Sequence, residues 1–233
     1  MDKFLVLGHR GYRAKYVENT IESFKKAIEY GADGIEYDAR LTRDEVLVVL
    51  HDDTINGIKL RDINYEELKN IKLKNNQTVP TVEEVIKSLS DNVFLNLEIK
   101  EVQASFLSYN ITKRYNALDR TLFSSFQVNA LRELRKIDKN VKIGLLVEYE
   151  TLNSIEDLHK ELKLDSLNLW IDALKEDIES SKNFLKKWKN LGLKTFLWTL
   201  NDPEDLHTFE SLYDAVITDE VELIVKEKRK MNG

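Results

Sequence analysis

The chain has 233 residues, no cysteine, and 41 acidic side chains against 35 lysines and arginines, which gives a formal net charge of −6. This composition is typical of a globular protein, and the length suits one large α/β domain or two small ones. The net acidity disfavours a nucleic-acid partner and adhesion to an anionic membrane surface. No apolar run approaches the ~20 residues of a membrane span or forms a signal-peptide core, so we expect no membrane anchor and a cytoplasmic protein.

Short apolar segments alternate with amphipathic ones along the chain. The expected strands are residues 4–9, 34–38, 93–99, 121–125, 141–147, 165–171, 193–199 and 214–218, and the clearest helices are 20–30, 127–138 and 175–190. A capping box of Asn19 and Glu22 is expected to start the first helix, and Gly31 to end it. Strand–helix alternation implies a parallel sheet, and eight strands in this length predict a closed (β/α)8 barrel, a TIM barrel. An open doubly wound sheet is the alternative.

Residues 41–79 break this alternation. They contain an extra strand from Val46 to Leu50, then His51-Asp52-Asp53, and then a polar stretch with a short helix near 64–71. We interpret this segment as a short insertion after the second strand of a single barrel domain that covers residues 1–233. The loops that follow barrel strands form the mouth of the active site, so the insertion is expected to form a small cap over that mouth.

Acidic side chains share one face on each of two expected strands. Glu36 and Asp38 lie on the same side of their strand, and Glu98 lies on the same side of the next as Lys100. Both strands place these acids at their C-terminal ends, so three carboxylates are expected to converge. An oxygen-only cluster suits Mg²⁺ or Ca²⁺, with Mn²⁺ also acceptable, and does not suit zinc. A network of buried salt bridges with Lys100 and Arg10 is the alternative.

Two of the four histidines fall near the same mouth, because His9 ends the first strand and His51 ends the inserted one. The three acids supply three negative charges, and a divalent cation with Arg10 and Lys100 would supply four positive ones. The excess of one matches a phosphodiester monoanion. Arginine is suited to clamping phosphate oxygens, a metal ion can polarise the phosphoryl group, and two imidazoles can serve as acid and base. These residues predict a metal-dependent phosphodiesterase.

A series of short motifs follows in the order found in one enzyme family. They are His9-Arg10-Gly11, Glu18-Asn19-Thr20, Gly31-Ala32-Asp33, Ile35-Glu36-Tyr37-Asp38, His51-Asp52, Pro80-Thr81, Asn96-Leu97-Glu98-Ile99-Lys100, Ser125-Phe126, Trp198-Thr199-Leu200-Asn201 and Ile217-Thr218-Asp219. Together they resemble the signature of the glycerophosphodiester phosphodiesterase family, within the phosphatidylinositol-phosphodiesterase-like superfamily of TIM barrels. The first motif alone would be a weak match, but the ordered set spans nearly the whole chain and is highly specific.

The resemblance implies a (β/α)8 barrel that hydrolyses a small-molecule glycerophosphodiester to glycerol phosphate and an alcohol. It also implies attack by a neighbouring glycerol hydroxyl on phosphorus, giving a cyclic phosphate that water then opens. The site residues it implies, by position in this chain, are the metal ligands Glu36, Asp38 and Glu98, the general acid/base pair His9 and His51, the phosphate-binding Arg10 and Lys100, and Trp198 in the wall of the substrate pocket.

Other residues of the motifs have supporting places. Glu18 is expected to orient Arg10 or, alternatively, to be an ordinary acid near a helix start. Ser125 and Asn201 lie at strand ends, where each could instead satisfy backbone groups in a turn. The less favoured alternative for Trp198 is a core residue that plugs the barrel, and the two places are compatible with each other.

The sequence departs from the family pattern at three places, of which one bears on substrate choice. Val17 replaces a proline, the turn Arg43-Asp44-Glu45 lacks the usual glycine, and an Arg-Thr-Thr segment after His51-Asp52 is missing. The missing segment belongs to the expected cap, so it affects the choice of leaving alcohol more than the chemistry.

Two alternative functions remain open at this point. A lysophospholipase D-like enzyme would keep the chemistry and act on a lipid, and an exposed apolar channel at the mouth would favour it. A non-catalytic phosphate-binding barrel would be favoured by the loss of a histidine or a metal acid, and all of these are present. The residues do not determine the head group, the metal, the histidine that acts as base in each step, or the oligomeric state.

Overall fold

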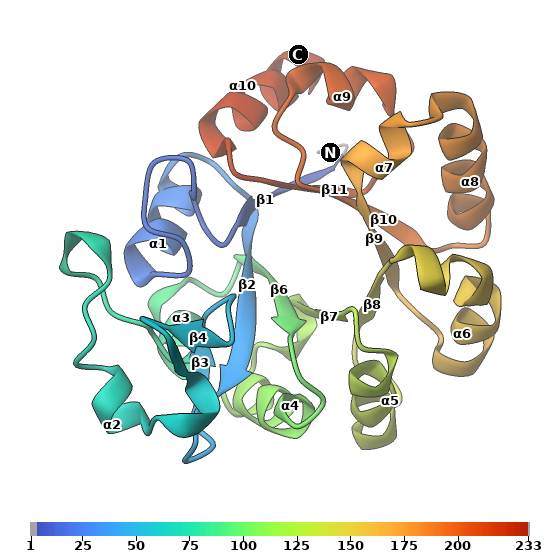
Figure 1. Ribbon diagram of the computed structural model, residues 1–233. Helices are drawn as coiled ribbons and strands as arrows, with labels where there is room; N and C mark the ends of the chain where they lie inside the picture. Colours follow the sequence, from blue (N-terminus) through green and yellow to red (C-terminus); the bar gives the residue numbers. More distant parts are fainter. Residues whose placement is uncertain (1–3, 233) are drawn as a thin grey trace.

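The computed structural model describes residues 4–232, and its strands form a closed barrel (Figure 1). The eight parallel strands of the ring are β1 (Leu5–His9), β2 (Gly34–Leu41), β6 (Phe94–Ile99), β7 (Thr121–Ser125), β8 (Ile143–Leu146), β9 (Ser166–Trp170), β10 (Lys194–Trp198) and β11 (Ala215–Thr218). Each pairs with its neighbours in chain order, and β1 closes the ring by pairing with both β2 and β11. The predicted TIM barrel is therefore confirmed, and the open sheet is excluded.

Helices surround the ring on its outer side (Figure 1). They are α1 (Ile21–Glu29), α3 (Val82–Ser88), α4 (Ala104–Arg114), α5 (Val128–Ile137), α6 (Ile155–Leu162), α7 (Ile171–Lys175), α8 (Ile178–Asn190), α9 (Pro203–Thr208) and α10 (Val221–Asn232), with 3₁₀ turns η3 (Leu118–Arg120) and η4 (Tyr149–Ser154). Within residues 4–232, no helix combines the length and the apolar character needed to cross a membrane.

Side-chain alternation along the strands separates two apolar layers. The larger core lies between strands and helices and includes Ile35, Tyr37 and Ala39 of β2. A smaller cluster inside the ring includes Leu7, Phe196 and Ile217. Because Glu36 and Asp38 alternate with the outward-facing residues of β2, they belong to the interior side, toward the C-terminal end of the ring.

Residues between β2 and α3 build a small substructure of their own. Its elements are β3 (Leu47–Val49), β4 (Thr54–Ile55), β5 (Ile58–Lys59), η1 (Leu60–Asp62), α2 (Tyr65–Leu68) and η2 (Lys74–Asn76). Strand β3 runs antiparallel to the end of β2, and a separate apolar cluster around Val48, Leu60 and Leu68 holds the rest together. The missing turn glycine has a visible consequence, because Glu45 adopts a left-handed φ of 60°.

Two local expectations are wrong. The N-cap of α1 is Thr20, whose hydroxyl accepts a hydrogen bond from the Ser23 amide, and not Asn19. Asn19 precedes the cap and adopts a left-handed φ of 55°. The expected helix 175–190 is interrupted, because Asp177 has extended backbone dihedrals and caps the start of α8.

Candidate active site

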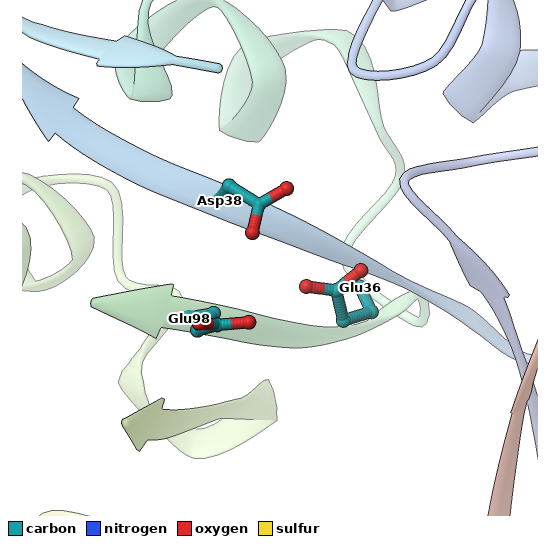
Figure 2. A group of neighbouring side chains, drawn as sticks. All are labelled: Glu36, Asp38 and Glu98. Atoms are coloured by element: carbon teal, nitrogen blue, oxygen red, sulfur yellow. The ribbon is translucent and has the colours of Figure 1, made fainter. Parts of the chain in front are cut away.

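Three carboxylates from the neighbouring strands β2 and β6 come together (Figure 2), from the middle of β2 and the C-terminal end of β6. The parallel register places Asp38 beside Glu98, and Glu36 two residues earlier faces the same side. One oxygen from each lies within 4.8 Å of the others, and all three residues are buried. The expected convergence of the acids is confirmed, whereas their role as metal ligands stays a prediction.

The two expected cations lie against these acids. Lys100 Nζ is 2.9 Å from Asp38 Oδ1 and 2.5 Å from Glu98 Oε1, and Arg10 Nε is 3.4 Å from Asp38 Oδ2. Burial would lower the pKa of Lys100 and of Arg10, but the neighbouring carboxylates outweigh it and raise both. Both side chains therefore remain positively charged at the site.

The three acids respond differently to burial. Burial and the nearby charge of Asp38 raise the pKa of Glu98 to about 7 and that of Glu36 well above its usual range. Burial also acts to raise the pKa of Asp38, but Lys100 and Arg10 lie so close that they lower it. When all three carboxylates are ionised, the two cations leave the cluster with a net charge of −1. A further cation would favour ionisation of all three acids.

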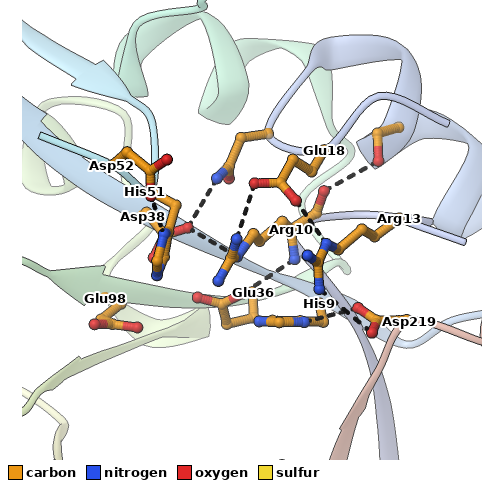
Figure 3. A network of polar contacts seen from close by, with 12 residues as sticks. His9, Arg10, Arg13, Glu18, Glu36, Asp38, His51, Asp52, Glu98 and Asp219 are labelled. Carbon is orange, nitrogen blue, oxygen red and sulfur yellow. Dashed lines mark hydrogen bonds and ion pairs between the residues drawn. The ribbon is translucent and has the colours of Figure 1, made fainter. Parts of the chain in front are cut away.

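Arg10 is held from several sides in the loop that follows β1 (Figure 3). Its backbone amide donates a hydrogen bond to Glu36 Oε2 at 3.0 Å, and its Nη1 donates to Glu18 Oε1 at 2.8 Å. The expectation that Glu18 contacts Arg10 is confirmed. Asn19 adds a contact from the same loop, because its Nδ2 donates to Asp38 Oδ2 at 2.8 Å.

His9 has a partner that sequence reasoning missed. Its Nδ1 lies 2.8 Å from Oδ1 of Asp219, the residue that follows β11 (Figure 3). Asn201 holds this aspartate, since its Oδ1 accepts the Asp219 backbone amide at 2.9 Å and its Nδ2 donates to Asp219 Oδ2 at 3.2 Å. With Nδ1 engaged, the Nε2 atom of His9 is left for a substrate. An acid directly after the last barrel strand was the available sequence signal.

His51 comes from the other side of the site, in the loop two residues after β3. Its Nδ1 lies 2.7 Å from Asp52 Oδ1, an exposed carboxylate next to it in the chain. Burial and the positive charge of Lys100 lower the pKa of His51. Among residues 41–79, His51 alone lines the cavity beside the acids, so the inserted segment supplies one wall residue to that cavity. Its role as a cap over the mouth stays a prediction.

A cavity of about 250 Å³ joins these groups at the mouth of the barrel. Its lining residues are His9, Arg10, Glu36, His51, Asn96, Glu98, Lys100, Ser124, Phe126, Leu146, Trp198 and Ile217. Of the eight residues expected at the site, only Asp38 is absent from this lining. Asp38 lies behind Arg10 and Lys100 at 1% exposure. Trp198 fits both of its expected places, because it also packs on the cluster inside the ring.

Two polar wall residues were not assigned a role from the sequence. Asn96 is paired in register with Glu36, and Ser124 with Glu98. Asn96 Oδ1 and Ser124 Oγ are both buried and have no hydrogen-bond partner within the described part of the chain. The sequence signal for Asn96 was its position two residues before Glu98, which places both side chains on the same face of the strand. Ser125, which sequence reasoning singled out, instead donates its hydroxyl to the Ile99 carbonyl at 2.7 Å.

The donor set fits a hard divalent cation. It offers three buried carboxylates on two neighbouring strands, with an unpartnered amide oxygen in the same row. Mg²⁺, Ca²⁺ and Mn²⁺ accept oxygen ligands of this kind, and no thiolate or imidazole belongs to the cluster.

Comparison with known proteins gives a consistent result. Residues 9–223 match the model of the glycerophosphoryl diester phosphodiesterase family. A glycerophosphodiester phosphodiesterase of Caldanaerobacter subterraneus subsp. tengcongensis is 34% identical, over 98% of this chain and 99% of its own.

Solved structures have the same fold. A glycerophosphodiester phosphodiesterase from Thermotoga maritima is 39% identical and superposes with a TM-score of 0.85, over 96% of this chain and 97% of its own. A phosphodiesterase of Oleispira antarctica, solved in complex with the product sn-glycerol-3-phosphate, shares the fold with a TM-score of 0.87. It is 24% identical and covers 96% of each chain.

Proposed function

The chain belongs to the glycerophosphoryl diester phosphodiesterase family, and from this premise we propose that it hydrolyses small glycerophosphodiesters with a divalent cation held by Glu36, Asp38 and Glu98. The products are glycerol phosphate and the alcohol of the head group. The observation that carries the proposal is the single cavity that both histidines, both cations and two of the three carboxylates line. The glycerol phosphate bound to the Oleispira antarctica enzyme of the same fold supports the same product here.

Each side chain has a task that follows from its contacts. Arg10 and Lys100 bind the anionic phosphodiester, and the arginine is already oriented by Glu18. The two imidazoles share the proton transfers: one accepts the proton of the attacking hydroxyl, and the other donates a proton to the oxygen of the departing alcohol. Asp219 and Asp52 orient His9 and His51 for these transfers. The metal ion supplies polarisation of the phosphoryl oxygen when it is bound.

Turnover of glycerophosphocholine, glycerophosphoethanolamine and glycerophosphoinositol, each measured with Mg²⁺, Ca²⁺, Mn²⁺ or a chelator, tests this function. We expect hydrolysis with at least one of the three ions and none after the metal is removed. Full activity in the presence of chelator would refute the metal assignment, and binding without turnover would favour the phosphate-binding barrel.

The histidine roles are tested by His9→Ala and His51→Ala. Each change should lower kcat by at least ~100-fold, because each removes a positioned acid or base. His207→Ala is the matched control, since His207 is exposed and contacts Glu227 away from the cavity. Wild-type rates in either site variant would refute its role.

A further inference from the structure

His51 lies in a stretch of backbone between two main-chain hydrogen bonds. The last one before it runs from the Leu50 amide to the Asp38 carbonyl at 3.2 Å, and the next one after it runs from the Leu60 amide to the Asp53 carbonyl at 2.8 Å. Between these two bonds the chain has left the ladder that β3 forms with β2, and it bends. The direction in which the His51 side chain points therefore depends on other contacts.

The side-chain contact of His51 is a weak anchor by itself. The side chain of its partner Asp52 is 74% exposed and that of His51 37% exposed. Ion pairs on the surface contribute little and are screened by salt. His9 differs, because the side chain of its partner Asp219 is 19% exposed and is itself held by Asn201. A residue other than Asp52 is therefore needed if His51 is to be fixed as firmly as His9.

Arg40 supplies such an anchor from β2. It lies two residues after Asp38, on the same face of the strand, and it is partly buried. Its Nε donates a hydrogen bond to the carbonyl oxygen of His51 at 2.7 Å. A hydrogen bond from a charged donor is stronger than one between neutral groups. Arg40 thus ties the main chain of His51 to the strand that carries Glu36 and Asp38.

Two other residues of the catalytic cavity are held in the same way. Ser23 Oγ donates to the Arg10 carbonyl at 3.0 Å, and Gln127 Nε2 donates to the Lys100 carbonyl at 2.6 Å. Arg10 and Lys100 each follow directly after a strand of the ring, where the regular ladder ends. In all three cases, a side chain from another segment fixes the main chain of a residue that lines the cavity. The recurrence of this contact favours a role in the site for the Arg40 bond.

We propose that Arg40 is a positioning residue for His51. It fixes the main chain so that the imidazole stays in the catalytic cavity, and it acts on the proton transfer only through His51. Arg40 does not itself line the cavity, which agrees with an indirect role. This inference rests on the proposed function, because its kinetic consequence requires His51 to act as acid or base. A displacement of a reacting group by about 1 Å can cost about 100-fold in rate.

The first test is Arg40→Met, assayed with glycerophosphocholine and the metal that supports turnover. We expect kcat to fall by about 10- to 100-fold with little change in KM, because Arg10 and Lys100 still bind the phosphodiester. Wild-type kcat in this variant would overturn the inference and leave the proposed function intact. A raised KM at unchanged kcat would show that Arg40 attracts the substrate by its charge, and it would also overturn the inference.

Arg61→Met is the matched control. Arg61 belongs to the same inserted segment as His51, donates to the Thr42 carbonyl at 3.4 Å and pairs with Glu101 at 3.0 Å. Its replacement removes the same charge and a similar link between the insertion and the barrel, without a contact to His51. We expect kcat to stay close to that of the wild type. Equal losses in the two variants would assign the effect to general loosening of the insertion and overturn the role of Arg40.

A double-mutant cycle shows whether Arg40 acts through His51. When Arg40→Met is added to His51→Ala, we expect little further loss of kcat, because residues that act through one another have non-additive effects. If Arg40→Met lowers kcat by the same factor with and without His51, Arg40 acts independently of the histidine and the inference is refuted.

Nuclear magnetic resonance separates this inference from catalysis. The imidazole signals of His51, assigned by their loss in His51→Ala, should shift or broaden in Arg40→Met and stay unchanged in Arg61→Met. The signals of His9 should stay unchanged in both. Unaltered His51 signals in Arg40→Met would overturn the inference even in an active enzyme. A wild type that hydrolyses no glycerophosphodiester, with His51 signals that still respond to Arg40→Met, would refute the proposed function and retain the anchoring of His51.

Discussion

His9 shows how one hydrogen bond prepares a side chain for its task. The contact of its Nδ1 with Asp219 joins the first and the last strand of the ring, and Asn201 holds the aspartate in place. Arg13 adds a longer contact to the same carboxylate at 3.5 Å. Asp219 is thus a positioning residue, because it acts on the reaction through His9 rather than by touching the substrate.

We predict that Asp219→Asn lowers kcat by at least ~10-fold with little change in KM, because the imidazole loses the carboxylate that orients it. The control is Asp214→Asn. Asp214 accepts the backbone amide of Thr195 near the start of β10, at the opposite end of the strands from the catalytic cavity, so its loss should affect stability rather than rate. Similar kcat values for the two variants would contradict the role of Asp219.

A second prediction concerns acid stability. Burial would raise the pKa of Asp219, but the hydrogen bond and charge of His9 outweigh it and lower that pKa. A carboxyl group whose pKa is lower in the native state stabilises the fold at pH values above its pKa in the unfolded state. This stabilisation is lost as the pH falls through the native-state pKa. The unfolding free energy of the wild type should therefore exceed that of Asp219→Asn, and the difference should shrink below about pH 4. Denaturation measured at several pH values tests this. A gap that widens on acidification would refute this.

At the scale of elements, the conformation of the loop between β1 and α1 depends on close packing of Gly11 against helix α1. Gly11 has φ 86°, and a Cβ added there would lie 2.2 Å from the Ser23 hydroxyl of α1. The Ser23 hydroxyl donates to the Arg10 carbonyl at 3.0 Å, so the same helix also shapes the loop that carries Arg10. The glycine of the first motif is therefore required by packing.

We expect Gly11→Ala to lower the free energy of unfolding by more than Gly57→Ala does. Gly57 also has a positive φ, 79°, but nothing lies within 4 Å of an added Cβ. Alanine at Gly57 thus meets only backbone strain, about 1–2 kcal/mol, whereas at Gly11 the clash adds a further ~1–3 kcal/mol. Urea denaturation of both variants measures the difference, and equal losses would show that the contact with Ser23 relaxes freely.

The whole molecule combines an acidic surface with a cationic site. Lys100 and Arg10 sit among three carboxylates inside the ring, and a divalent cation added there would make the cavity net positive by one charge. The chain as a whole has a formal net charge of −6, and most of its 41 acidic side chains lie outside this site. An acidic protein therefore offers local attraction for an anionic diester.

Metal binding should stabilise the entire fold, because it ties β2 to β6. At a metal concentration ~100 times the dissociation constant, linkage adds about 2.7 kcal/mol, which corresponds to a rise in Tm of roughly 5–10 °C for a chain of this size. Calorimetry with and without Mg²⁺, Ca²⁺ or Mn²⁺ measures this, with Na⁺ at equal ionic strength as the control. Glu98→Gln should abolish most of the rise, and an undiminished rise in that variant would place the ion elsewhere.

The sequence by itself determined the barrel, the convergence of the three acids and the family. Alternation of side chains along a strand is a local property, so the spacing of Glu36, Asp38 and Glu98 within their strands is enough to assign them to one face. The order of the short motifs along the chain is likewise a property of the sequence alone, and it identifies the family.

Only the tertiary structure decided which side chains pair and where open space remains. His9 and Asp219 are 210 positions apart, and no local pattern connects them. Asn19 was expected to cap a helix and instead contacts Asp38, because the left-handed backbone before Thr20 turns it toward β2. A second cavity, at the C-terminal ends of β8, β9 and β10, is lined by residues from several loops and helices whose spacing depends on how those elements pack around the ring. Cavities of this kind arise from packing between distant segments, which residue patterns do not encode.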